Sequence, residues 1–141
     1  MMGADISRPY RNALVLDDDP TSQALACITL EALGISQVVV MANGREGLQA
    51  YDRMASKPDL VVCDLYMPDM DGIEFIQALG NRDFDGALVL CTAGDPTLLE
   101  VACQVAIKAH GLDLVGAFPK PLDPVALARA LHLPPPPAAA L

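Results

Sequence analysis

Short apolar segments alternate five times with longer segments of mixed polarity along this chain of 141 residues. The apolar segments are rich in Val and Leu and lack the strict polar–apolar alternation of a half-exposed strand. Parallel strands that are covered by helices on both faces have this composition. The pattern therefore predicts five buried strands, at residues 12–16, 37–41, 59–63, 87–91 and 113–118.

The segments between and after these strands have apolar residues at helical spacing and recognisable helix starts. Three begin with an aspartate followed by proline, which suits the N-cap and the first helical position. Asn43 and Asp71 are candidate caps for the other two helices, and Gly34 and Gly111 lie where helices are expected to stop. The aspartates of the three Asp-Pro pairs are Asp19, Asp95 and Asp123.

Five strand–helix units with short connections predict an α/β domain, a (βα)5 doubly wound parallel sheet with helices on both faces. Ligands of such sheets bind outside the carboxyl ends of the strands, where the strand order reverses. We therefore expect any chemistry just after residues 16, 63, 91 and 118.

Those four strand ends carry carboxylates, a hydroxyl and an ammonium group. They are Asp17–Asp19, Asp64, Thr92 and Lys120. Clustered carboxylates suit a hard divalent cation such as Mg²⁺, which would offset their repulsion and keep Asp64 ionised and nucleophilic. A lysine and a hydroxyl would hold the oxygens of a transferred phosphoryl group. Each residue has an ordinary explanation as a turn, cap or surface residue, so the hypothesis depends on their conjunction.

Composition narrows the function classes. The formal net charge of −9 argues against direct binding of nucleic acid, whose phosphates require Lys and Arg. The four cysteines form no CxxC pair and neither histidine lies near them, so free thiols of a reducing compartment are expected rather than a zinc site. No segment reads as a signal peptide or a membrane span, and we expect a cytoplasmic protein without membrane contact.

The last nine residues, 133–141, contain four consecutive prolines and end in AAAL. Such a stretch cannot continue a helix and predicts a Pro-rich tail or the stub of a linker to a further domain. Whether the terminal AAAL is native stays open. We therefore place one domain at residues 10–132 and a tail at 133–141.

The motifs LVLDDDP, DLVVCDLYMPDMDGIEF, LCTAG and FPKP together resemble the receiver domain of two-component response regulators. The resemblance implies the flavodoxin-like strand order 2-1-3-4-5 and a switch without turnover. A histidine kinase or phosphotransfer protein would pass a phosphoryl group to Asp64. Mg²⁺ would be held by Asp18 directly, by Asp17 through water, by Asp64 and by the backbone carbonyl of Tyr66. Thr92 and Lys120 would contact the phosphoryl oxygens.

The resemblance also bears on residues around this centre. The Lys120–Pro121 bond is often cis in the family. Tyr66 and Gly94 occupy positions that tend to tune dephosphorylation, and we hypothesise that Tyr66 shields the phosphoryl group from water. The family often has a switch aromatic three residues before the lysine, where this chain has Ala117 followed by Phe118. That departure puts the usual aromatic switch in doubt.

The fourth and fifth helical segments have few charges: Glu100 and Lys108 in the fourth, Arg129 in the fifth. One explanation is an alanine-rich composition with a modest exposed patch. The other is that the face formed by the fourth helix, fifth strand and fifth helix docks a second copy or an output domain. Residues 104–121 are also similar to receivers that precede EAL-type cyclic di-GMP phosphodiesterase domains.

Three alternatives remain at this stage. A stand-alone receiver would shuttle phosphoryl groups without an output domain. An Mg²⁺-dependent phosphohydrolase of haloacid-dehalogenase type also uses an aspartyl nucleophile and would use Asp17 and Asp19 as its DxD pair, but the chain is too short for its cap domain. A receiver-like interaction module would work without phosphorylation, which the complete set of five key residues disfavours.

Overall fold

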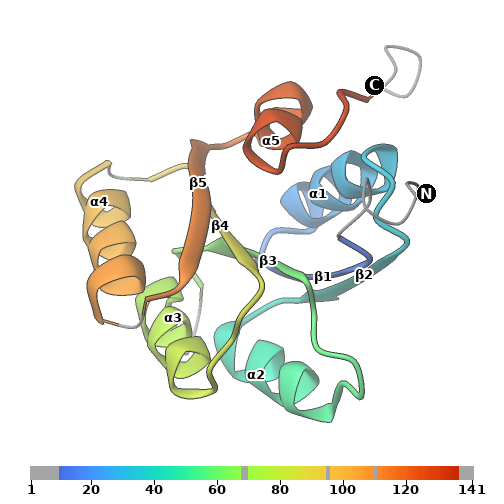
Figure 1. Cartoon of the computed structure of the whole chain (residues 1–141). Helices are drawn as coiled ribbons and strands as arrows, with labels where there is room; N and C mark the ends of the chain where they lie inside the picture. Colours follow the sequence, from blue (N-terminus) through green and yellow to red (C-terminus); the bar gives the residue numbers. More distant parts are fainter. Residues whose placement is uncertain (1–9, 68–69, 95, 110, 137–141) are drawn as a thin grey trace.

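The computed structural model describes residues 10–67, 70–94, 96–109 and 111–136. In this part of the chain five parallel strands form one sheet in the order β2-β1-β3-β4-β5, with helices on both faces (Figure 1). The predicted fold class and strand order are confirmed. The strands are β1 (Asn12–Leu16), β2 (Gln37–Met41), β3 (Leu60–Asp64), β4 (Ala87–Thr92) and β5 (Asp113–Pro119). The helices are α1 (Pro20–Ala32), α2 (Gly44–Arg53), α3 (Gly72–Asn81), α4 (Pro96–Gln104) with the π-turn η1 (Val105–Ala109), and α5 (Pro124–Ala130).

Alternate residues of the strands supply two hydrophobic cores, one on each face of the sheet. Leu14 and Leu16 of β1 point into a core shared with α2, α3 and α4, in which Phe75 is fully buried. Ala13 and Val15 of β1 point the other way, into a core shared with α1 and α5. β1, β3 and β4 are buried on both faces, which explains their continuous apolar sequences.

Four of the predicted N-caps are present. In each case a side-chain oxygen accepts a backbone N–H of the first helical turn, at 2.8–2.9 Å. The cap of α3 is a reciprocal capping box with Glu74. The four caps are Asp19, Asn43, Asp71 and Asp123. The fifth predicted cap, Asp95, lies outside the described residues.

Predicted element boundaries differ from the observed ones in three strands. β3 begins and ends one residue later than predicted, so that Asp64 belongs to the strand and pairs with Cys91 of β4. Asp59 stays outside β3, because its carboxylate accepts the backbone N–H groups of Arg11 and Asn12. β4 and β5 each extend by one residue, because Thr92 pairs with Pro119.

The helix ends also depend on contacts that the sequence pattern did not reveal. α4 gives way to the π-turn η1, which brings Ala106 into the core against α3 and β5. α5 is shorter than its apolar pattern, because His132 adopts a positive φ of 58° and Leu133 donates to Ala128. Leu133 packs into the core beside α1 and α5. Gly34 and Gly111 have positive φ angles at the predicted stops.

The four cysteines are free thiols, as expected. Cys63 and Cys91 are buried, and burial raises the pKa of Cys91 to about 11. Cys27 and Cys103 are only half-buried. Among the described residues, no helix has the length and hydrophobicity that a membrane span requires.

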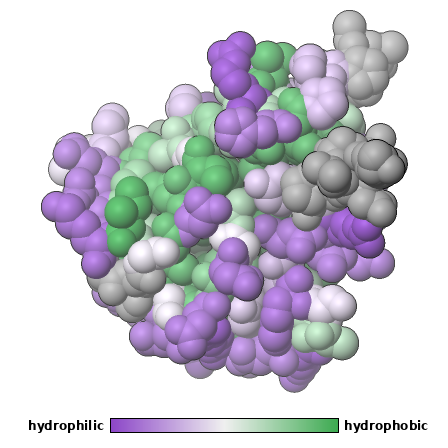
Figure 2. Space-filling view, in the orientation of Figure 1, coloured by the Kyte–Doolittle hydropathy of each residue, from purple (hydrophilic) through white to green (hydrophobic). Residues whose placement is uncertain are grey.

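Apolar surface lies over β5, between α4 and α5 (Figure 2). Three large apolar side chains on the two helical segments and the π-turn are more than 40% exposed: Val101, Ile107 and Val125. Few charges interrupt this surface, in agreement with the sequence pattern of the fourth and fifth helical segments.

Replacing Asp19 with alanine removes the carboxylate that accepts the Ser22 amide. We expect the melting temperature to fall by a few degrees, as is usual for the loss of an N-cap. Thermal unfolding followed by circular dichroism in EDTA measures this effect. The matched control is Asp18→Ala, which removes the same charge from the same exposed run without touching the cap. An equal loss in both variants would contradict the cap assignment.

Candidate functional site

The carboxyl ends of β1, β3, β4 and β5 bring four of the predicted residues to one edge of the sheet. Asp17 follows β1, Asp64 is the last residue of β3, Thr92 is the last residue of β4, and Lys120 follows β5. Asp17, Asp64 and Thr92 are at most 5% exposed. The strand order reverses between β1 and β3, because β2 is added on one side of β1 and β3 on the other. The residues therefore lie where a doubly wound sheet binds ligands.

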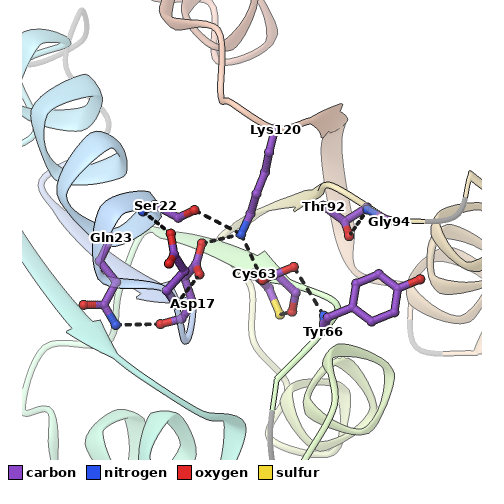
Figure 3. Close-up of polar contacts among 10 residues, drawn as sticks. Asp17, Ser22, Gln23, Cys63, Tyr66, Thr92, Gly94 and Lys120 are labelled. Atoms are coloured by element: carbon purple, nitrogen blue, oxygen red, sulfur yellow. Dashed lines mark hydrogen bonds and ion pairs between the residues drawn. The ribbon is translucent and has the colours of Figure 1, made fainter.

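Lys120 joins two strand ends by ion pairs (Figure 3). Its ammonium lies 2.8 Å from Oδ2 of Asp17 and 3.0 Å from Oδ2 of Asp64. A third, longer contact of 3.4 Å reaches the hydroxyl of Ser22 in the first turn of α1. The backbone N–H of Lys120 donates to the carbonyl of Thr92, which fixes the start of the β5–α5 connection against β4. The Lys120–Pro121 bond is cis, as the resemblance implied.

Burial and pairing act in opposite directions on these charges. Burial raises the pKa of Asp64, and the hydrogen bonds from Lys120 and from the Tyr66 amide offset only part of that effect. Burial alone would lower the pKa of Lys120, but its hydrogen bonds to Asp17 and Asp64 outweigh burial and hold it above its usual value. Lys120 therefore stays protonated and supplies the positive charge at this edge.

Three carboxylates are close enough to share one cation. Asp17, Asp18 and Asp64 each offer an oxygen within 4.8 Å of the other two. Asp17 and Asp64 are buried, and Asp18 is exposed to solvent. Hard oxygen donors with one open side are what Mg²⁺ prefers, because it retains several waters. The donor set therefore fits Mg²⁺. Tyr66, whose carbonyl is the further predicted ligand, follows Asp64 by two residues in the β3–α3 connection.

The three consecutive aspartates have different environments. Oδ1 of Asp17 accepts the backbone N–H of Asp19 at 2.9 Å, and its Oδ2 faces Lys120. The carbonyl of Asp17 accepts the side-chain amide of Gln23 at 2.6 Å. The Asp19 carboxylate instead accepts the Ser22 amide, and this hydrogen bond holds the pKa of Asp19 below its usual value.

Thr92 and Tyr66 approach the site from its α4 side. The hydroxyl of Thr92 accepts the backbone N–H of Gly94 at 3.1 Å. The backbone N–H of Tyr66 donates to Oδ1 of Asp64 at 3.3 Å. The Tyr66 side chain is 45% exposed and extends toward Gly94, away from Lys120 (Figure 3).

Ala117 and Phe118 of β5, which precede Lys120, lie on opposite faces of the sheet. Ala117 packs against the core shared with α2, α3 and α4, on the side where a switch aromatic would act. Phe118 packs into the core shared with α1 and α5, with its ring against Gly116. Phe118 therefore cannot take the place of the aromatic that Ala117 lacks.

Sequence analysis missed two contributors on α1. Ser22 contacts Lys120 and Gln23 contacts the Asp17 carbonyl. The sole signal available was that both belong to the first helical turn after the aspartate run. It also missed an apolar cavity of about 270 Å³ under Lys120, between α1 and the β5–α5 connection. The apolar residues that line it include Val15, Leu25, Ala26, Val62, Cys91 and Leu122.

Comparison with protein families matches residues 13–132 to the response regulator receiver domain. A positive alginate biosynthesis regulatory protein of Pseudomonas aeruginosa is 33% identical over 122 residues, which are 85% of this chain and 45% of that protein. A probable chemotaxis protein CheY of Rhizobium etli is 34% identical over 96 residues, covering 65% of this chain and 72% of that protein. This chain thus spans less than half of the alginate regulator.

The chain is also similar to part of a longer enzyme and to a solved receiver domain structure. The cyclic di-GMP phosphodiesterase RocR of Pseudomonas aeruginosa is 27% identical over 112 residues, which are 79% of this chain and 28% of RocR. A receiver domain structure from Clostridium thermocellum superposes with a TM-score of 0.73 at 22% identity, covering 86% of this chain and 91% of the other. At that identity the superposition supports the fold alone.

Replacing Lys120 with glutamine leaves Asp17 and Asp64 facing each other without a cation. We expect the free energy of unfolding in EDTA to fall by about 1–3 kcal/mol. This is less than the loss of a fully buried ion pair would cost, because the Lys120 side chain is 18% exposed. Without Lys120 the pKa of Asp64 rises further above its unfolded value. The loss is therefore largest at neutral pH. It shrinks as the pH falls toward about 4, the ordinary range of an aspartate in the unfolded chain, because protonation removes the charge of Asp64.

Urea unfolding at both pH values measures this loss. The control is Lys108→Gln, an exposed lysine of η1, which should change the free energy of unfolding by less than about 0.5 kcal/mol. A loss at Lys120 that does not depend on pH would show that the ion pairs do not govern the stability of this edge.

Proposed function

Because this chain belongs to the response regulator receiver family of two-component signalling, we propose that it is a phosphorylatable switch with Asp64 as its phosphoryl acceptor. One observation carries the proposal: the buried Asp64 carboxylate ends β3 between the Lys120 ammonium and the acidic residues that follow β1. Receiver domains generally accept phosphoryl groups rather than turn over substrates. A slow loss of the phosphoryl group by hydrolysis is part of the same proposal.

The chemistry follows from the two oxygens of Asp64. Oδ2 is held by Lys120 at 3.0 Å, whereas Oδ1 accepts only a long hydrogen bond of 3.3 Å from the Tyr66 amide among the contacts described. Oδ1 is therefore the better nucleophile. It attacks the phosphorus of a phosphohistidine, an O–P bond forms, and the N–P bond breaks. The electron pair of that bond returns to the imidazole nitrogen. The partner's histidine leaves neutral because the second ring nitrogen of the phosphohistidine carries a proton.

Asp17, Asp18, Asp64 and the carbonyl of Tyr66 would hold Mg²⁺, with Asp17 acting through a water molecule. When bound, the ion screens the carboxylates and balances the charge of the phosphoryl oxygens. Lys120 is placed to hold one phosphoryl oxygen by a charge-assisted hydrogen bond, and the Thr92 hydroxyl to hold another. Thr92 has to turn from the Gly94 amide to do so.

The phosphohydrolase alternative is disfavoured by the role of Asp19. A DxD pair would need Asp17 and Asp19 to face the same substrate. The Asp19 carboxylate is occupied in capping α1 through the Ser22 amide. Asp18, rather than Asp19, belongs to the cluster with Asp17 and Asp64.

The proposed partners are a sensor histidine kinase or phosphotransfer protein upstream and an output domain or second copy downstream. The apolar surface over β5 between α4 and α5 supports docking there (Figure 2). Val101, Ile107 and Val125 are exposed on the flanking helical segments. The domain at 10–132, followed by the tail at 133–141, suits an amino-terminal module of a longer regulator such as RocR, and a stand-alone shuttle is the alternative. Free cysteines favour the cytoplasm.

Replacing Asp64 with asparagine removes the acceptor oxygen's charge while keeping its shape. We expect wild type to gain one phosphoryl group when incubated with Mg²⁺ and acetyl phosphate, and Asp64→Asn to gain none. Intact-protein mass spectrometry measures the adduct. Asp85→Asn, an exposed carboxylate before β4, should be phosphorylated like wild type. An adduct of normal yield on Asp64→Asn would refute the assignment.

Replacing Asp18 with alanine removes one of the three cation-binding carboxylates. We expect its phosphorylation in Mg²⁺ to fall to the level that wild type shows in EDTA, because the remaining carboxylates hold the cation weakly. The measurement is the adduct yield against Mg²⁺ concentration. Asp19→Ala is the matched control and should keep its Mg²⁺ dependence. Phosphorylation of Asp18→Ala at wild-type Mg²⁺ concentrations would remove Asp18 from the metal site.

A further inference from the structure

Gly94 lies directly under the ring of Tyr66. A Cβ atom on Gly94 would overlap Cε2 of the ring and would lie 2.5 Å from Cζ and 2.6 Å from Oη. Real Cβ atoms do not approach other atoms that closely. Gly94 is not among the glycines with positive φ, so the reason for glycine here is space and not backbone conformation. The contact between the β3–α3 and β4–α4 connections therefore depends on the absence of a side chain at position 94.

Two hydrogen bonds connect this contact to the acceptor and to the switch hydroxyl. The backbone N–H of Tyr66 donates to Oδ1 of Asp64 at 3.3 Å. The backbone N–H of Gly94 donates to Oγ1 of Thr92 at 3.1 Å. Asp64, Tyr66, Gly94 and Thr92 thus form one continuous chain of contacts. Figure 3 shows the Tyr66 ring extending toward Gly94.

Phosphorylation of Asp64 acts on both ends of that chain. The Thr92 hydroxyl has to turn toward a phosphoryl oxygen, and a threonine turns by a whole rotamer step because its χ1 angle occupies staggered positions. Its oxygen then leaves the Gly94 amide, which is free to bond water because Gly94 is exposed. The β4–α4 connection loses the hydrogen bond that holds Gly94 under the ring.

The Tyr66 ring can also lie in a neighbouring cleft. Tyr66 forms part of the wall of an open cleft of about 410 Å³ between the β3–α3 connection and α4. Met67, Ile73 and Leu98 supply apolar surface in this cleft. A ring that is 45% exposed on Gly94 can gain apolar contact there. Leu98 belongs to α4, so the movement of the ring changes the surface of that helix.

The other aromatic residues do not lie where they could contact Gly94 and the surface of α4. All six aromatic side chains of the chain are described, and Tyr66 is the one that is exposed. Tyr51, Phe75 and Phe84 are buried in the core on the α2, α3 and α4 side. Phe118 lies on the opposite face of the sheet, with Tyr10 at its edge. The position on β5 that faces α4 carries the methyl group of Ala117.

We propose that Tyr66 is the positioning aromatic of this receiver: its ring, seated on Gly94, follows the Thr92 hydroxyl and transmits phosphorylation of Asp64 to α4. This inference rests on the proposed function of Asp64. Tyr66 acts in place of the switch aromatic that β5 lacks, because residue 117 is alanine. Glycine is required at position 94 because a larger side chain would exclude the Tyr66 ring.

The test uses the 141-residue chain, labelled with 3-fluorotyrosine and observed by fluorine NMR. The chain has three tyrosines, and Tyr66→Phe identifies the Tyr66 resonance by its disappearance. We expect Mg²⁺ with acetyl phosphate to shift the Tyr66 resonance and to leave those of Tyr10 and Tyr51 in place. In Gly94→Ala we expect that resonance to be displaced before phosphorylation and to move little afterwards. Ala93→Ser, in the same connection, should behave like wild type.

The outcomes separate this inference from the proposed function. A phosphoryl adduct on Asp64 with an unmoved Tyr66 resonance overturns the role of Tyr66 and leaves the acceptor intact. No adduct on wild type overturns both. Equal displacement in Gly94→Ala and Ala93→Ser would show that the connection responds to any substitution and would also overturn the role of Gly94.

A double-mutant comparison tests the contact itself. We expect Gly94→Ala to lower the melting temperature by a few degrees in wild type. In a Tyr66→Ala background the same change should have no effect or raise it, because the clash is gone and alanine restricts the unfolded chain. The same loss in both backgrounds would mean that the ring does not lie on Gly94.

Discussion

The carboxyl edge of the sheet depends on the ion pairs that Lys120 makes with Asp17 and Asp64. Both residues are buried, and their carboxylates would repel each other without a cation. One ammonium at 2.8 and 3.0 Å offsets both charges. Because the partners come from the ends of β1, β3 and β5, this contact also joins three segments that are distant in the sequence. The same ion pairs therefore stabilise this edge of the sheet and set the charges of the site.

A site with compensated charge responds strongly to added charge. Asp64 is buried and its pKa is raised, so its charged form depends on Lys120. A cation held by the neighbouring carboxylates would favour the charged form further. A phosphoryl group on Asp64 would change that balance and draw the Lys120 ammonium and the Thr92 hydroxyl inward. Thr92 is presently bonded to the Gly94 amide, so the first consequence falls on the β4–α4 connection and on the ring of Tyr66 that lies over it.

Local rules account for most of the fold. A strand's apolar run and a helix cap each involve residues that are close together in the sequence. The sequence alone was therefore sufficient to predict the strand pattern and the caps Asp19, Asn43, Asp71 and Asp123. The functions of Asp17 and Asp19 were separable for the same reason, since an Asp-Pro pair marks a helix start. The strand order came from the resemblance, because the hydrophobic pattern of a strand does not name its neighbours. The boundaries at Asp64 and Thr92 required the register of adjacent strands.

The sequence by itself determined which chemical groups stand at the strand ends, because parallel strands place their carboxyl ends at one edge. Only the tertiary structure decided how those groups pair. It placed Lys120 between Asp17 and Asp64, turned Phe118 to the face away from Thr92, and brought Tyr66 onto Gly94. These contacts join residues from different strand ends, and their geometry depends on sheet twist, side-chain direction and available space. No local pattern encodes those quantities.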